Sequence, residues 1–414
     1  MRCALQATVL AALGAAMLAD MPSASGAPTD FALEPYQMVR SLQLIQDRIA
    51  NGDSAAMPMQ RKLLEMIDAR LNKVGIDALT KERNFHALLM YAMSGGNPAT
   101  VGALLQKAKV GPADKVLAEG VMAYISGRPA DAIRALRSVD PLTEEPELGA
   151  FIALVKGSVL VTENPGRALS ALDQARLLAP GTLVEEAALR RSLALTVQLG
   201  DKVRFLRISD QYIRRFLHSP YAGQFADSFV AGVVKLHPDL DLKAVAAAIS
   251  EMDEEHRHFI YLRLARAATL AGKTDLAAFA SKHAELPAGD GKAPPDPRAR
   301  LYAGIASITS GNIGEIIRKL QAIDPQSLSE SDRRLRDAAL RIAREVTASP
   351  RTPETTPARK AETPRKGEAS SPVASAASSP PKPDLASVKA TDTLVSQTRR
   401  QLQSIDKLLQ EGSE

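Results

Sequence analysis

The sequence predicts an all-α protein: a divergent tetratricopeptide-like helical-repeat solenoid, followed by a disordered Pro/Ser-rich linker and a short C-terminal amphipathic helix. Three observations predict this fold class. Aromatic residues make up only 4% of the 414 residues, and Trp is absent, which favours packed helices over sheets rich in β-branched and aromatic side chains. Apolar residues recur at helical spacing, and strand-like alternation is nearly absent. Turns containing Gly or Pro return at a regular interval.

Residues 1–26 have the pattern of a secretory signal peptide. Arg2 supplies a positive charge, residues 3–18 are apolar, and small residues follow at 23–27. An apolar segment of about 16 residues is shorter than the roughly 20 that span a bilayer, and the small residues suit signal peptidase. An uncleaved anchor is the alternative. Cleavage would remove Cys3, the single cysteine, so we expect a cysteine-free mature chain in the periplasm, without disulfides or a membrane-spanning segment.

The helical-repeat domain is expected over residues 27–347, and two helices open it. The first covers residues 36–49 and ends at Asn51-Gly52, and the second covers residues 59–74, with Gly75 in the position of a C-cap glycine. Their apolar stripes are formed by Met38, Val39, Leu42, Ile45 and Ile49 in the first helix, and by Leu63, Leu64, Ile67 and Leu71 in the second.

A repeat emerges when the rest of the body is aligned on its tight turns. Successive turns lie 31 to 39 residues apart, close to the 34 of tetratricopeptide repeats. An irregular helical bundle is the alternative, but similar apolar helices flank most of the turns. The unit around His237 fits least well because its turn lacks glycine. The turns are Gly96-Asn97-Pro98, Gly127-Arg128-Pro129, Asn164-Pro165-Gly166, Gly200-Asp201, His237-Pro238-Asp239, Gly272-Lys273 and Gly311-Asn312.

Two segments interrupt or follow the array. Residues 284–297 are rich in Pro and Gly and are expected to form a surface loop. Residues 348–383 contain eight Pro and six Ser, and too few apolar residues to offset the entropy of an ordered chain, so we expect a disordered linker. Residues 384–414 can form an amphipathic helix. Its apolar face, a candidate partner-binding stripe, consists of Leu394, Leu402, Ile405 and Leu409.

Residues suited to catalysis or metal binding are present but not arranged in recognised motifs. His256 and His258 are two positions apart and point in different directions on a helix, and His86, His218 and His283 are isolated in sequence, so they are expected to be capping or surface residues. The acidic groups at residues 144–147 and 185–186 follow a Pro or Gly, as helix N-termini do. No nucleophile elbow, dinucleotide fingerprint or P-loop is present. We therefore predict no catalytic residues, no cofactor and no metal.

The charge balance gives no indication of a nucleic-acid partner. Lys and Arg number 52 and Asp and Glu 47, so the net charge is 52 − 47 = +5 over 414 residues. A nucleic-acid-binding domain normally carries a dense basic patch. The residues alone thus predict an exported helical-repeat protein that binds another protein on an extended concave surface.

The opening helix resembles a known family. Residues 34–53, EPYQMVRSLQLIQDRIANGD, are similar to the start of the mature chain in MotC, a family of periplasmic motility (chemotaxis) proteins of alphaproteobacteria. The total length, signal peptide, helical body and Pro/Ser-rich tail also fit this family. The resemblance implies a non-enzymatic protein required for flagellar rotation, which acts on the stator through the periplasmic part of MotB. It implies no cofactor and no particular site residues.

Two other functions stay open at this point. One is a general envelope scaffold or assembly chaperone of tetratricopeptide type. The other is a cell-wall hydrolase or its activator, in which Glu145 or Glu186 would have to be catalytic, because glycoside hydrolysis requires two carboxylates that face each other across a cleft.

Overall fold

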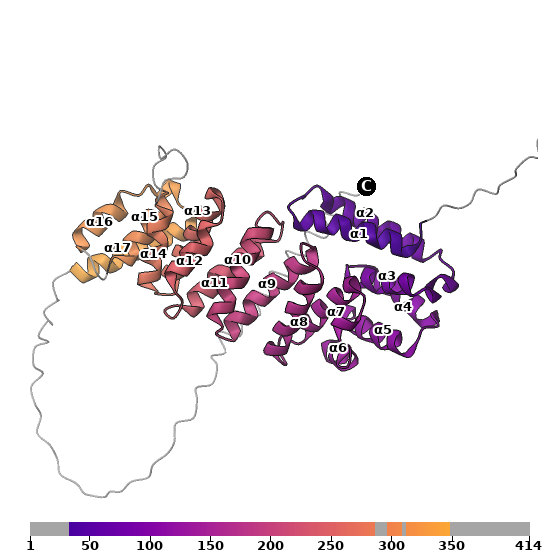
Figure 1. Cartoon of the computed structure of the whole chain (residues 1–414). Helices are drawn as coiled ribbons and strands as arrows, with labels where there is room; N and C mark the ends of the chain where they lie inside the picture. Colours follow the sequence, from indigo (N-terminus) through magenta and orange to yellow (C-terminus); the bar gives the residue numbers. More distant parts are fainter. Residues whose placement is uncertain (1–32, 286–295, 309–311, 348–414) are drawn as a thin grey trace, which may run out of the picture. The chain divides into compact units, whose positions relative to one another are not determined.

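The computed structural model describes residues 33–285, 296–308 and 312–347, and these residues form helices without any strand (Figure 1). All of them belong to the first of two units into which the chain divides, residues 1–349. The predicted all-α class is therefore confirmed. The predicted signal peptide (1–26), linker (348–383) and C-terminal helix (384–414) lie outside the described residues, as does most of the predicted loop at 284–297.

The helices follow one another with short connections, and several begin with Pro, whose fixed φ suits the first helical turn. The α-helices are α1 (Pro35–Ala50), α2 (Ala56–Leu71), α3 (Glu82–Met93), α4 (Pro98–Lys107), α5 (Pro112–Ile125), α6 (Pro129–Leu136), α7 (Pro146–Val159), α8 (Pro165–Leu178), α9 (Leu183–Gln198), α10 (Lys202–Phe216), α11 (Ala222–Leu236), α12 (Leu242–Ser250), α13 (Glu254–Leu270), α14 (Thr274–Ala284), α15 (Pro297–Ala306), α16 (Ile313–Gln321) and α17 (Glu330–Thr347); the 3₁₀ helices are η1 (Ile76–Thr80), η2 (Pro141–Thr143) and η3 (Pro325–Ser327).

From α3 onward the helices stack as a solenoid of pairs. Each odd-numbered helix from α3 to α15 packs against the next odd-numbered helix, and most also pack against the even-numbered helix that follows them in the chain. Each of the seven predicted turns joins the two helices of one pair, from α3–α4 to α15–α16. The pair α11–α12 is the least regular: its turn contains a cis His237–Pro238 peptide, and α12 packs mainly on α10 and α13.

Four of these turns share one hydrogen-bonded structure. In the turn between α3 and α4 the left-handed glycine is Gly95, with φ 92°, and the N–H of Gly96 donates to the carbonyl of Tyr91 at 2.9 Å. Gly127, Gly200 and Gly272 all have φ between 67° and 69°, the left-handed conformation that ends many helices. The residue after each glycine donates its N–H to the carbonyl five positions earlier, at 2.9 Å in every case. This pattern is the Schellman motif. The donor and acceptor residues in the other three turns are Arg128 and Ala123, Asp201 and Thr196, and Lys273 and Ala268.

The two helices of a pair approach closely where glycine faces a leucine. A Cβ atom built on Gly120 of α5 would lie 2.4 Å from Leu136 of α6, and one on Gly157 of α7 would lie 2.6 Å from Leu172 of α8. Both leucines are buried. The small residues therefore allow close contact between the helices of a pair, as in other repeat arrays.

The boundary predicted after the second helix is wrong by a few residues. Helix α2 ends at Leu71 with Asn72 as its C-cap, and Gly75, with φ −65°, is the N-cap residue of the 3₁₀ helix η1. Gly75 therefore makes no left-handed cap. The amide of Asn72 donates to the backbone oxygen of Asp68 and ends the helix earlier, as Asn commonly does.

Helix α1 does not simply add one more layer to the stack. Its N-cap residue Glu34 bonds to Lys81 at 2.6 Å and to Asn84 at 2.9 Å, at the start of α3. Near its other end, Asp47 Oδ1 accepts a hydrogen bond of 3.2 Å from the backbone N–H of Leu183, the first residue of α9. Helix α1 therefore bridges the start of α3 and the start of α9.

Asp47 gives this bridge a dependence on pH. Burial raises the pKa of its carboxyl group, and the hydrogen bond from Leu183 offsets this only in part. A carboxyl group whose pKa is raised on folding favours the folded state at low pH, and this contribution is lost as pH rises through the folded-state pKa. We expect Asp47→Asn, which keeps an acceptor oxygen, to stabilise the protein by less than about 1 kcal/mol at pH 7.

The gain from Asp47→Asn should vanish in acid, where the wild-type carboxyl group is also neutral. Denaturant unfolding at pH 7 and pH 4 measures this difference. Asp47→Leu serves as the control: it removes the acceptor, leaves the Leu183 N–H without its partner, and should destabilise by about 1 kcal/mol at both pH values. A loss of stability for Asp47→Asn at pH 7 would contradict the assignment.

Candidate partner-binding groove

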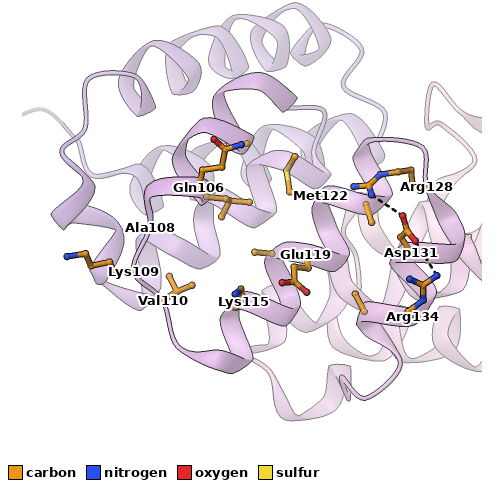
Figure 2. A pocket seen from close by; sticks show the side chains of 15 residues that line it. Gln106, Ala108, Lys109, Val110, Lys115, Glu119, Met122, Arg128, Asp131 and Arg134 are labelled. Atoms are coloured by element: carbon orange, nitrogen blue, oxygen red, sulfur yellow. Dashed lines mark hydrogen bonds and ion pairs between the residues drawn. The ribbon is translucent and has the colours of Figure 1, made fainter.

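A groove with a volume of about 1020 Å³ lies on the side of the even-numbered helices in the described structure. Helices α4 and α6 form its walls and α5 forms its floor (Figure 2). Its lining includes the segment 108–110, which connects α4 to α5. The groove is open along one side, as a site for an extended segment of another protein needs to be.

The helix packing explains why the groove exists. Helix α6 lies closely along α5, with Leu136 packed against Gly120. Helix α4 meets α5 over a shorter stretch, because residues 108–111 separate the two helices. The unequal spacing leaves part of the α5 surface uncovered between its two neighbours.

The groove has an apolar part that is bordered by charged side chains. Leu105, Val110 and Met122 are half-buried side chains in the lining. Four basic residues, Lys109, Lys115, Arg128 and Arg134, and two acidic ones, Glu119 and Asp131, border them. Lys115 and Glu119 lie on α5, as Met122 does. Asp131 binds Arg128 at 2.9 Å and Arg134 at 3.4 Å, as the dashed lines in Figure 2 show. The charged border therefore carries a net charge of 4 − 2 = +2.

This arrangement suits protein recognition. An apolar surface with a charged border accepts the apolar face of an amphipathic helix, and the polar border residues set its orientation. The excess of basic residues favours a partner segment that carries acidic residues beside its apolar stripe. The lining contains no His, Ser or Cys that could serve as a base or nucleophile.

A second pocket of about 590 Å³ lies between α1 and the helices that α1 bridges. Its lining includes His86 of α3 and Glu145, the N-cap residue of α7. His86 is a buried residue, contrary to the surface or capping role predicted for it. Its ring nitrogens lie 3.3 Å from Glu145 and 3.7 Å from Asp114, so it links the starts of α5 and α7.

The carboxylates considered for wall hydrolysis are engaged in structural contacts. Glu186 is fully buried, with Arg190 at 3.0 Å and the hydroxyl of Tyr212 at 2.8 Å. Glu185 is bound by Arg215 at 2.7 Å. Both lie in the first turn of α9, as predicted, whereas Glu145 lies in the pocket beneath α1. The structure does not bring Glu145 and Glu186 together in one pocket.

The histidines at 256 and 258 have separate partners, as their spacing predicted. His256 Nδ1 lies 2.6 Å from Asp253, and His258 Nε2 lies 3.4 Å from Asp296. His283 is half-buried and stacks on Tyr261 at a ring distance of 4.8 Å. His218, isolated in the sequence, lies next to His256 with their ring centres 5.7 Å apart. Sequence spacing could not show this neighbour, because it comes from an adjacent helix pair.

The groove itself was not predicted, although one signal was present. Residues 121–125 form a run of five apolar or aromatic residues, which one neighbouring helix cannot cover completely. Val121 and Ala123 are buried, and Met122 faces the groove.

The predicted binding stripe of Leu394, Leu402, Ile405 and Leu409 lies outside the described residues. Among the helices that the structure describes, none is both long and apolar enough to cross a bilayer.

Comparisons with known proteins agree on one family. The family model described as chemotaxis protein MotC matches residues 1–414. A chemotaxis protein MotC from Rhizobium meliloti (strain 1021) is 37% identical over 361 residues, which cover 86% of this chain and 82% of that protein. No solved structure matches the chain.

Proposed function

The chain belongs to the MotC family of chemotaxis proteins, and from this premise we propose that it acts in the periplasm by binding the flagellar stator, through the periplasmic part of MotB, without catalysing a reaction. The observation that carries this proposal is the groove between α4 and α6, whose apolar part and basic border suit a segment of another protein. The signal-peptide pattern of residues 1–26 supports the periplasmic location.

The charged residues of α9 and of the groove differ in their contacts, and this difference agrees with a binding role. The buried carboxylates of Glu185 and Glu186 in α9 are held by arginines and a tyrosine, so their hydrogen-bonding needs are met within the helix pair. The groove, by contrast, presents charged side chains around an uncovered apolar surface. Such a surface is typical of a recognition site.

The C-terminal stripe of Leu394, Leu402, Ile405 and Leu409 is proposed as a second contact with the partner. An isolated helix of about 20 residues is marginally stable in water, so such a stripe needs a surface on which to fold. Truncation after Pro383 tests this idea. Unchanged thermal stability with weaker partner binding supports the partner role, whereas lower stability indicates docking on the protein's own solenoid. If neither changes, the stripe has no such role.

The motility role is tested in a deletion strain. Flagellated cells that do not rotate their flagella support the proposal, and normal swimming contradicts it. Affinity capture from the periplasm then distinguishes a dedicated stator partner from the general scaffold or chaperone: retention of many unrelated envelope proteins would favour the scaffold. Cleavage of peptidoglycan by the purified chain would favour the hydrolase.

Met122→Glu provides the direct test of the groove. We expect this variant to bind the periplasmic part of MotB at least about tenfold more weakly, because a charge then occupies the apolar part of the groove where the partner's apolar face must be desolvated. Binding to immobilised MotB fragment measures the effect. The fold should persist because Met122 is only half-buried.

Leu177→Glu is the matched control for Met122→Glu. Leu177 of α8 is 72% exposed and lies outside the groove lining, so the same kind of substitution there should leave binding unchanged. Equal binding by wild type and Met122→Glu, with both proteins folded by circular dichroism, would exclude this groove as the MotB site without excluding the motility role.

A further inference from the structure

Three potential metal ligands come together in the described structure at a place that the proposed function does not use. His218 lies in the connection between α10 and α11, Asp253 is the N-cap residue of α13, and His256 is in the first turn of α13. One ligand atom from each residue lies within 4.8 Å of the other two. Two segments that are more than 30 residues apart in the chain thus place two imidazoles and one carboxylate around a single point.

The donor set matches zinc. Zn²⁺ takes imidazole nitrogen and carboxylate oxygen at about 2.0–2.2 Å in a tetrahedral site, which corresponds to ligand atoms about 3.3 Å apart. His218 and Asp253 are exposed side chains, and small rotations about their side-chain bonds can bring their ligand atoms to that separation. Water completes the fourth position of a three-ligand zinc site.

The local charges favour a cation despite the helix N-terminus nearby. The positive end of the α13 dipole opposes a bound cation. Asp253 accepts the backbone N–H of His256 at 3.0 Å and so caps this end, and Glu254 and Glu255 add negative charge in the first turn.

The position of the cluster gives an ion there a structural consequence. A Cβ atom built on Gly52 would lie 2.9 Å from the Cβ of His218, so the turn between α1 and α2 rests against this histidine. An ion held by His218 and His256 would join two neighbouring helix pairs and would fix the residue on which the α1–α2 turn rests.

We infer that His218, Asp253 and His256 form a zinc-binding site that joins the α10–α11 connection to the start of α13, next to the α1–α2 turn. The inference is independent of the proposed stator binding, because its test measures metal binding and thermal stability.

Isothermal titration of the purified chain, free of any histidine tag, with ZnCl₂ tests the site. We expect one equivalent of Zn²⁺ to bind with a dissociation constant in the micromolar range and to raise the melting temperature, because an ion that binds only the folded state stabilises it. MgCl₂ should do neither, since Mg²⁺ prefers oxygen ligands. His218→Ala and His256→Ala should each weaken zinc binding at least tenfold.

His258→Ala is the matched control, since His258 lies on the same helix but contacts Asp296. It should bind Zn²⁺ like wild type. The inference is overturned if wild-type protein shows no saturable Zn²⁺ binding at concentrations below about 1 mM. A dissociation constant above that value is too weak for a specific site. Equal affinity in wild type and His218→Ala also overturns the inference, and circular dichroism of that variant, whose substitution is in an exposed connection, confirms that it is folded.

Discussion

Leu136→Asp is expected to lower the free energy of unfolding by about 3 kcal/mol or more, because it places an unpaired charge in a close-packed interface. Leu136 is 1% exposed at the end of α6 and packs against Gly120 of α5. Denaturant unfolding followed by circular dichroism measures the loss.

Leu177→Asp is the control for this experiment. Leu177 is 72% exposed, and surface substitutions of this kind usually change stability by no more than about 0.5 kcal/mol. If Leu136→Asp unfolds at the same denaturant concentration as wild type, α6 does not pack on α5 as described. The walls of the groove would then need to be reassigned as well.

Glu186→Leu should destabilise the protein by about 3 kcal/mol, since removing one partner of a buried ion pair leaves the other partner uncompensated. Glu186 is fully buried, and it accepts hydrogen bonds from Arg190 and from the hydroxyl of Tyr212. The loss should fall at the low end of the usual range, because Arg190 also bonds to Gln224 at 2.7 Å and stays partly exposed.

The double variant Glu186→Leu/Arg190→Leu separates the ion pair from simple loss of packing. Removing both charges eliminates the uncompensated arginine, so the double variant should be more stable than Glu186→Leu alone. Denaturant midpoints of the wild type, of Glu186→Leu, of Arg190→Leu and of the double variant provide the data for a double-mutant cycle. Strictly additive losses would show that the two side chains do not interact.

Local signals in the sequence were sufficient to predict most of the solenoid. The glycine at the end of a helix and the following polar residue specify the turn by short-range backbone geometry, which is why Gly127, Gly200 and Gly272 marked the turns correctly. The prediction that Gly75 caps the second helix was wrong. Glycine is a common C-cap residue, but α2 already ends at Asn72. Helix boundaries depend on such competition between neighbouring residues.

Contacts between repeats could not be predicted from the sequence. The groove depends on how far the segment 108–111 holds α4 from α5, and the pairing of His218 with His256 depends on the stacking of successive pairs. Neither the separation of α4 from α5 nor the distance between the two histidines is set by residues adjacent in the chain.

The bridge formed by α1 changes how the N-terminal half can unfold. A linear repeat array behaves nearly as a one-dimensional chain of neighbours, in which an end unit can fray without disturbing distant ones. The hydrogen bond between Asp47 and Leu183 closes a loop of 136 residues, so the terminal helix gains its full set of contacts only when α9 is also folded. Opening α9 therefore removes the contacts between α1 and α9, while the packing of α1 on α2 and α3 remains, so the stability of α1 is coupled to that of α9. Helix α1 is thus synthesised well before α9, the helix that completes its contacts.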